Sequence, residues 1–395
     1  MLSIKIKDFL YYIGVNDRET SLFEGQWPIE NGISYNSYLL KGEKTCLLDT
    51  VKITKVDEFE KKLEEALDGR DLDYLVIHHM EPDHSGSIEI IRKLYPNVTI
   101  VGNMKTKNFL ENFYGITDNF QVVKEGDILD LGDRKLKFFM TPMVHWPESM
   151  VSFEESSGIL FSQDAFGTYG ALDGPIFDDQ VDLDHYLEEG IRYYTNIVGK
   201  FSMMVQNSLK KLSTLEIKMV CPVHGPVWRE NPQTIIDLYD KLSSYQTKEG
   251  VVVVYASMYG NTSHMAEHIA YALGEEGVEK VKVFDVSKTD PSYIISEIWK
   301  YKGLVLGSCT YNNSLFPKMR YLVDIIEENK IKNHALAIFG SYSWSGGALK
   351  ELKEFGENSQ CDLVEKTVET LSAPSKEDYK GLEEIAKELA KKIKE

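Results

Sequence analysis

The pattern of strand-like and helical segments changes once, at the polar stretch SSYQTKEG of residues 243–250. This change constrains the fold more than any other feature. Upstream of it, short strand-like segments dominate, with helical patterns at residues 56–67, 87–94 and 186–212. Downstream, four short apolar runs alternate with amphipathic segments. A chain of 395 residues is long enough for two or three domains. We therefore predict two domains, residues 1–249 and residues 250–395.

The apolar runs of the second domain lie at residues 251–256, 281–286, 303–308 and 335–340. They are apolar throughout and do not alternate with polar residues. Parallel strands have this pattern when helices cover both faces of their sheet. The second domain is thus predicted to be a doubly wound α/β sheet, and the first a mixed α/β domain.

Charge and cysteine content exclude several classes of function. Lys and Arg number 44 against 62 Asp and Glu, a net charge of −18 that repels nucleic acids and anionic membranes. The four cysteines form no C-x-x-C pair, so neither a disulfide framework nor a thiolate metal site is indicated. Residues 1–8 alternate apolar and basic side chains and lack the apolar core of a signal peptide. We expect a cytoplasmic protein with no nucleic-acid or membrane partner.

A dense group of metal-ligand side chains follows the apolar segment Leu75–Val76–Ile77, in the sequence HHMEPDH. In an extended backbone, residues at i, i+2 and i+4 project to one side, so His79, Glu81 and Asp83 can converge while His84 turns toward a second centre. Any one of these residues would fit a solvated polar loop. Together, beyond the end of a buried strand, they predict a metal site.

Three further candidates, His145, Asp164 and His224, each follow an apolar run. With them, the chain resembles the metallo-β-lactamase superfamily, whose signature is H-x-H-x-D-H. The motif here is His79-x-Glu81-x-Asp83-His84, with glutamate in the place of the second histidine. The resemblance implies an αββα sandwich of two sheets with helices outside and two bound metals.

The glutamate changes the expected metal. A carboxylate is a harder, anionic ligand than imidazole, which favours iron over zinc. This form of the motif, with the downstream domain, resembles the flavodiiron proteins, or A-type flavoproteins. That resemblance implies two irons per chain, one held by His79, Glu81 and His145, the other by Asp83, His84 and His224, with Asp164 bridging them. It also implies that Tyr193 is able to hydrogen-bond a bound substrate, although packing in the core is the simpler explanation for a tyrosine there.

A second group of candidate binding residues lies in three loops, each at the expected carboxyl end of a strand. The first, residues 257–262, opens an amphipathic helix and offers hydroxyl, amide and backbone donors to a phosphate. It lacks the lysine of GxxxxGK[ST] and the glycines of GxGxxG, which favours a monophosphate ligand, although such turns are also common helix caps.

The three loops resemble those of flavodoxin, which implies FMN, with the phosphate on the first loop, the ring between the other two and Trp344 as the stacking aromatic. Cys309 and Ser343 depart from the residues most expected in flavodiiron proteins. The predicted FMN contacts are Ser257, Met258, Tyr259, Gly260, Asn261 and Thr262; Ser308, Cys309, Thr310, Tyr311, Asn312 and Asn313; and Ser341, Tyr342, Ser343, Trp344, Gly346 and Gly347.

The two cofactors imply an oxidoreductase. A reduced iron pair and a reduced flavin each give two electrons, which matches the four needed to convert dioxygen to water; reduction of two nitric oxide molecules to nitrous oxide needs two. The expected function is therefore reduction of dioxygen, nitric oxide or both. The alternatives are a zinc-dependent hydrolase with a flavodoxin-like regulatory domain and a flavin electron carrier whose first domain only docks partners.

The resemblance also implies partners. It predicts a head-to-tail homodimer, or a tetramer built from it, in which each flavin serves the partner's iron centre. Because no C-x-x-C pair is present, we expect electrons from a separate rubredoxin-type protein or a reduced deazaflavin coenzyme.

Overall fold

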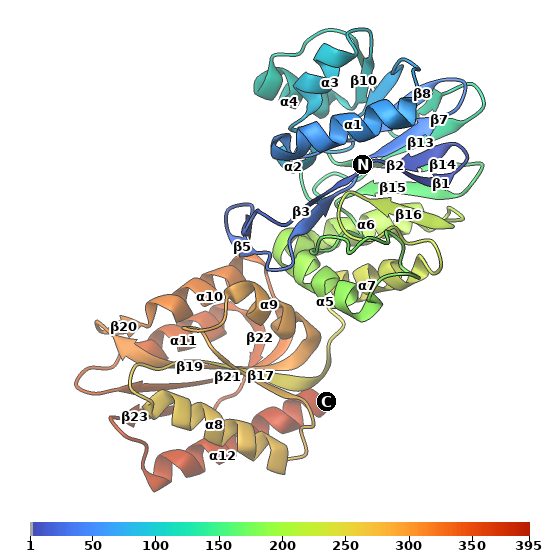
Figure 1. Cartoon of the computed structure of the whole chain (residues 1–395). Coiled ribbons are helices and arrows are strands. Elements are labelled where there is room, and N and C mark those ends of the chain that lie inside the picture. The colour runs from blue at the N-terminus through green and yellow to red at the C-terminus, as the bar shows by residue number, and fades with distance from the viewer. Residues whose placement is uncertain (1–2) are drawn as a thin grey trace. The chain divides into compact units, whose positions relative to one another are not determined.

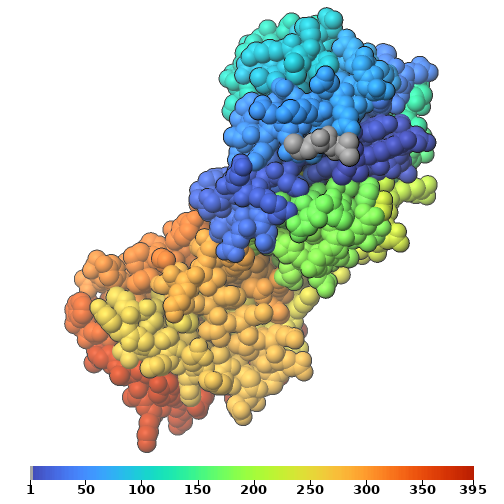
Figure 2. Space-filling model, in the orientation of Figure 1, coloured from blue at the N-terminus to red at the C-terminus, as the bar shows by residue number. Residues whose placement is uncertain are grey.

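The computed structural model describes residues 3–395, so the first two residues of the 1–8 segment lie outside the described residues. The chain divides into two compact units, Met1–Ser243 and Ser244–Glu395 (Figures 1 and 2). Across residues 3–395, no helix combines the length and apolar character that crossing a bilayer requires.

The first unit is built on two sheets. The larger has the order β1-β2-β7-β8-β9-β10-β11 and the smaller the order β12-β13-β14-β15-β16. The strands of the larger sheet are β1 (Ile4–Lys7), β2 (Leu10–Tyr12), β7 (Tyr38–Lys41), β8 (Thr45–Leu48), β9 (Tyr74–Val76), β10 (Thr99–Gly102) and β11 (Phe120–Val122). Those of the smaller sheet are β12 (Ile128–Asp130), β13 (Lys135–Met140), β14 (Met150–Glu154), β15 (Ile159–Gln163) and β16 (Met219–Pro222).

The two sheets share one apolar core. Leu40 and Val76 of the larger sheet and Phe138 and Phe161 of the smaller belong to the same buried cluster. Helices lie outside, with α1, α3 and α4 on the side of the larger sheet and α5 to α7 on the side of the smaller (Figure 1). The predicted αββα layering is confirmed. The helices are α1 (Val56–Leu67), α2 (Pro82–Ser85), α3 (Ile88–Leu94), α4 (Met104–Tyr114), α5 (Leu183–Tyr193), α6 (Ser202–Leu212) and α7 (Gln233–Ser243), with the 3-10 turn η1 (Ile53–Lys55).

The helix predicted over residues 186–212 is wrong as one continuous element. Helix α5 ends at Tyr193 and continues as a π-helical segment, η2 (Tyr194–Val198), and a 3-10 turn, η3 (Gly199–Phe201), before α6 begins. A π-segment shifts the backbone register by one residue, which apolar periodicity alone does not reveal. The irregularity lies directly after Tyr193, one of the predicted site residues.

Two small two-stranded sheets complete the first unit. Strands β3 (Val15–Asp17) and β6 (Ile33–Tyr35) pair antiparallel, as do β4 (Leu22–Phe23) and β5 (Trp27–Pro28). The β4–β5 hairpin packs Phe23 against the rings of Tyr169, Tyr193 and His224. It therefore borders the loops that carry the predicted metal ligands.

The second unit is the predicted parallel sheet, in the order β18-β17-β19-β21-β22. Helices α8 and α12 cover one face and α9 to α11 the other (Figure 1). The strands are β17 (Lys248–Ala256), β18 (Val281–Asp285), β19 (Tyr301–Tyr311), β20 (Ser314–Leu315), β21 (Lys332–Tyr342), β22 (Gln360–Leu363) and β23 (Val368–Leu371). The helices are α8 (Asn261–Glu275), α9 (Pro291–Lys300), α10 (Pro317–Glu328), α11 (Ala348–Asn358) and α12 (Lys376–Lys394).

The central strands of this sheet leave no room beside Gly307. Gly307 of β19 pairs with Phe339 of β21, and a Cβ atom at Gly307 would lie 2.0 Å from the Cζ atom of that ring. We expect Gly307→Ala to lower the free energy of unfolding of the second unit by about 1–3 kcal/mol, through overpacking. Gly274→Ala is the matched control, because Gly274 lies in exposed helix with nothing within 4 Å of a new Cβ. It should raise stability, by up to about 1 kcal/mol. Hydrogen exchange of β19 and β21 amides in urea measures both; equal protection in the two variants would contradict the packing argument.

Candidate functional site

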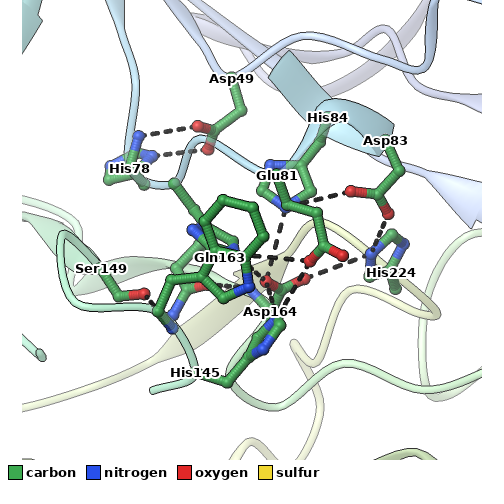
Figure 3. Close-up of polar contacts among 12 residues, drawn as sticks. Asp49, His78, Glu81, Asp83, His84, His145, Ser149, Gln163, Asp164 and His224 are labelled. Atoms are coloured by element: carbon green, nitrogen blue, oxygen red, sulfur yellow. Dashed lines mark hydrogen bonds and ion pairs between the residues drawn. The ribbon is translucent and has the colours of Figure 1, made fainter. Parts of the chain in front are cut away.

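The predicted metal ligands come from four loops of the first unit, at the end of the sandwich where β9, β15 and β16 finish (Figure 3). Strand β9 ends at Val76, and the following loop carries His79 and Glu81 into the short helix α2. Pro82 occupies the first turn of α2, where its missing N–H costs nothing. This turn places Asp83 and His84 beside the earlier pair rather than farther along an extended chain.

Asp164 lies at the middle of the group. Its Oδ2 atom is 3.2 Å from His79 Nε2, 3.5 Å from His84 Nε2 and 3.4 Å from His145 Nε2. Its other oxygen, Oδ1, is 3.3 Å from His224 Nε2. One carboxylate thus faces all four imidazoles, with its two oxygens turned toward different neighbours.

The remaining carboxylates divide the group into two halves. Glu81 Oε2 lies 3.0 Å from His145 Nε2 and 3.5 Å from His79 Nε2. On the other side of Asp164, the Asp83 carboxylate lies 3.2 Å from His224 Nε2 and 3.6 Å from His84 Nε2. The structure therefore brings together all seven residues singled out in the sequence.

The donor atoms at the centre fit metal ions. His79, His84, Asp164 and His224 are fully buried, yet several of their facing atoms have no hydrogen-bond partner among the described residues. These atoms are His79 Nε2, His84 Nε2, Asp164 Oδ2 and His224 Nε2; both oxygens of the partly buried Asp83 also have no partner among the described residues. Buried polar atoms without partners are costly, and convergent imidazole and carboxylate atoms are the ligand type of di-metal carboxylate sites. Three overlapping sets of side chains have ligand atoms close enough to share an ion: His79, Glu81, His84 and Asp164; Asp83, His84 and His224; and Glu24, Glu81 and His145.

The carboxylates and imidazoles of this group shift one another's pKa values. Burial alone lowers the pKa of His145 and His224, but hydrogen bonds and charges from Asp164, with Glu81 or Asp83, outweigh it. They raise the pKa of His145 to about 9 and that of His224 to about 10. Burial also opposes ionisation of Asp164, yet the surrounding histidines hold its pKa well below the ordinary value. Metal ions bound here would take the place of protons on these side chains.

Contacts around the ligands fix which ring nitrogen faces the centre. His79 Nδ1 donates to Glu148 Oε1 at 2.6 Å, which leaves its Nε2 atom directed at Asp164 and Glu81. His224 Nδ1 donates to the backbone oxygen of Ser34 at 2.7 Å and is oriented in the same way. Sequence reasoning missed Glu148 and Ser34, because neither stands in the ligand motif; the only available signal was a carboxylate three residues after His145.

His78 points away from the centre and joins the two sheets. Its Nδ1 donates to Asp49 Oδ2 at 2.7 Å, and its backbone N–H donates to Asp49 Oδ1 at 2.8 Å (Figure 3). The Ser152 hydroxyl lies 2.8 Å from its Nε2. Asp49 follows β8 of the larger sheet and Ser152 lies in β14 of the smaller. This contact holds the start of the ligand loop in place.

Tyr193 approaches the centre from the end of α5. Its hydroxyl donates to Asp164 Oδ1 at 2.9 Å, and the side chain is fully buried. Burial, followed by the Asp164 charge, raises its pKa well above the ordinary value, so the phenol keeps its proton and acts as a donor. Trp146 stacks edge-on against His79, with 5.0 Å between ring centroids.

The second unit has a cavity of about 320 Å³ at the carboxyl ends of β17, β19 and β21. Its lining residues are uncharged and, apart from Ser372, come from the three predicted loops. Hydroxyl groups gather there: Thr262 and Ser341 are 2.9 Å apart, and Ser257 accepts from the Gly260 N–H. Trp344 is 87% exposed at the rim. The lining is Ser257, Met258, Tyr259, Asn261, Thr262, Cys309, Thr310, Tyr311, Asn312, Asn313, Ser341, Tyr342, Ser343, Trp344, Ser345 and Ser372.

Four predicted contacts do not line this cavity. Gly260 caps α8 with φ of 100°, and Ser308 is buried and donates to the Cys309 oxygen. Gly346 and Gly347 border a neighbouring pocket, where a Cβ on Gly347 would lie 2.2 Å from the Asn313 oxygen. These residues shape the loops. Ser345 and Ser372 were missed, the latter because it follows β23, a strand that the sequence did not reveal.

Comparison with known proteins agrees with both halves of this description. Residues 33–225 match the family described as ODP family beta lactamase, and residues 253–388 match the flavodoxin family. An anaerobic nitric oxide reductase flavorubredoxin of Escherichia coli is 36% identical, over 89% of this chain and 74% of the relative. Rubredoxin oxygen:oxidoreductase from Desulfovibrio gigas has a TM-score of 0.96 at 30% identity, covering 99% of this chain and 98% of that one. The flavodiiron protein from Giardia intestinalis has a TM-score of 0.95 at 26% identity, covering 99% and 96%. The two named enzymes are oxidoreductases, and the hydrolase alternative is not supported.

The Glu148 contact gives a test of ligand orientation. Glu148→Ala removes the acceptor that fixes the His79 ring, so we expect apparent metal affinity to fall about 10- to 100-fold. Metal retained during titration with a chelator measures this. Glu155→Ala, an exposed carboxylate in the same unit, should behave as wild type. Unchanged retention in Glu148→Ala, with folding checked by circular dichroism, would show that His79 needs no such support.

Proposed function

This chain belongs to the flavodiiron protein family, and on that premise we propose that it reduces dioxygen to water, nitric oxide to nitrous oxide, or both. The observation that carries the proposal is the carboxylate of Glu81 facing His145 and His79, in a group centred on Asp164. A zinc hydrolase motif has imidazole at this position, whereas a carboxylate suits iron that changes oxidation state. When bound, two irons and one FMN supply the four electrons that reduction of dioxygen consumes.

We assign the metal ligands as the two halves of the group. His79, Glu81 and His145 would hold one iron, and Asp83, His84 and His224 the other. Asp164 would bridge them, because its two oxygens face different histidines. The His84 ring has the fewest contacts that fix its orientation. Neither of its nitrogens has a hydrogen-bond partner among the described residues, whereas His79 and His224 are oriented through Nδ1.

Tyr193 is proposed as a hydrogen-bond donor beside the reacting molecule. Its hydroxyl already donates to Asp164, and its raised pKa keeps the proton on the phenol. The buried rings of Phe23, Tyr169 and His224 surround it. A donor held in a dry, aromatic environment can orient a small polar molecule without competing water.

The cavity of the second unit is the proposed FMN site. Hydroxyl and backbone donors at the start of α8 suit a phosphate, and this helix terminus adds a partial positive charge. The loops after β19 and β21 would enclose the ring, with Trp344 at its edge. The predicted contacts at Gly260, Ser308, Gly346 and Gly347 are proposed to act by shaping the loops.

We also propose the protein's oligomeric state, its electron donor and its location. A head-to-tail homodimer, alone or within a tetramer, would bring the flavin of one protomer to the iron centre of its partner. The electron donor is proposed to be a rubredoxin-type protein, as the names of two relatives imply for those proteins, or a reduced deazaflavin coenzyme. We propose a cytoplasmic location.

The first test of function measures metal and turnover together. Protein purified after growth with ample iron should contain about two irons and one FMN per chain. Mixed anaerobically in its fully reduced state with dioxygen or nitric oxide in a stopped-flow spectrometer, it should reoxidise, and the flavin and iron absorbance should change during turnover. Two zincs per chain with hydrolysis of a thioester or lactam would refute the proposal.

Asp164 gives a second test. Asp164→Ala removes the carboxylate that faces all four imidazoles, and we expect loss of both metals and of gas reduction with FMN retained. Metal analysis, flavin absorbance and gas consumption are the readouts. Asp179→Ala, which removes a surface ion pair with Arg229, is the control. Full activity in the Asp164 variant would favour the electron-carrier alternative.

A further inference from the structure

The β4–β5 hairpin carries an acidic residue over the metal group that the ligand motif does not include. Its turn is closed by a hydrogen bond from the Gln26 N–H to the Phe23 oxygen, at 2.9 Å. Glu24 and Gly25 follow Phe23 with φ of 51° and 70°. A left-handed conformation is normal for glycine but costs a glutamate roughly 1 kcal/mol. The backbone therefore accepts strain at the residue that presents the carboxylate.

The Glu24 carboxylate lies within reach of one metal position. A ligand oxygen of Glu24, a ligand oxygen of Glu81 and a ring nitrogen of His145 all lie within 4.8 Å of one another. Ligand atoms about 2.0–2.2 Å from a common metal have separations of this order. Glu81 and His145 belong to the half of the site that also contains His79.

The hairpin is fastened in this position. Phe23, the neighbour of Glu24, contacts the rings of Tyr169, Tyr193 and His224, with centroids 5.6, 6.1 and 5.7 Å away. At the other end of the hairpin, Arg192 donates to the Pro28 oxygen at 2.8 Å. The same guanidinium lies 4.4 Å from the Tyr169 ring centroid. Glu24 is thus held over the site from both strands, although the residue itself is exposed.

We propose that Glu24 is an additional carboxylate ligand of the iron held by His79, Glu81 and His145. This inference rests on the proposed function, because it requires iron at that position. It makes the two irons unequal: one has Glu81 and Glu24 besides the shared Asp164, and the other has Asp83. A second hard, anionic ligand favours the ferric state of the first iron. It also occupies a coordination position that an incoming molecule would otherwise take.

Mössbauer spectra of ⁵⁷Fe-enriched protein test the ligation directly. In Glu24→Gln we expect the isomer shift and the quadrupole splitting of one ferric signal to change, while those of the other ferric signal stay as in the wild type. Loss of one iron per chain, with the second retained, would support the same assignment. Glu30→Gln, an exposed charge just past the same hairpin, is the matched control and should leave both signals unchanged.

Azide affinity of the ferric protein supplies a second measurement and does not depend on turnover. Removal of a ligand in Glu24→Gln and Glu24→Ala should tighten azide binding. Tighter azide binding with unchanged Mössbauer signals would mean that Glu24 acts only through its charge, and would overturn the ligand assignment. If the wild type contains two irons and reduces the gases, and the Glu24 variants give the same Mössbauer signals as the wild type, only the role of Glu24 is overturned. Absence of iron from the wild type would overturn the proposed function itself.

Discussion

The first unit is organised around the cost of burying charge. Three carboxylates and four imidazoles converge within one small volume, most of them without any contact to solvent. Such a group is tolerated only if protons or metal ions balance its charge. Hydrogen bonds and charges from the carboxylates raise the pKa values of His145 and His224, which favours protons on these rings. With metals bound, the same atoms would be ligands, so one set of side chains would balance its charge in either way.

The surrounding structure keeps these atoms in place. The ligand loop begins at His78, whose side chain links Asp49 of one sheet side to Ser152 of the other. At the far side, Gly225 has φ of 74°, and a Cβ there would lie 2.1 Å from Thr168 Oγ1. Only glycine allows the chain after His224 to pass so close. Rigid contacts of this kind let small loops hold ligands at fixed separations.

The second unit meets a different requirement. Its cavity is lined by neutral hydroxyl, amide and aromatic side chains rather than by lysine or arginine. A helix terminus and backbone donors suffice for a monophosphate, and neutral walls allow a flat ring to lie between two loops. The two units therefore differ in the chemistry of their sites. The site of the first requires that buried charges be balanced, and the cavity of the second suits an uncharged ring.

The ligand motif and the four apolar runs could be identified from the sequence, because each is defined by residue type and short spacing along the chain. His79, Glu81, Asp83 and His84 lie within six positions, and parallel buried strands need continuous apolar residues. The contacts of Glu148 and Ser34, the position of Glu24 and the π-segment after Tyr193 depended on the tertiary structure. A ring's tautomer, the approach of a distant hairpin and a one-residue shift in a helix arise from contacts between segments far apart in the chain, and local pattern does not encode such contacts.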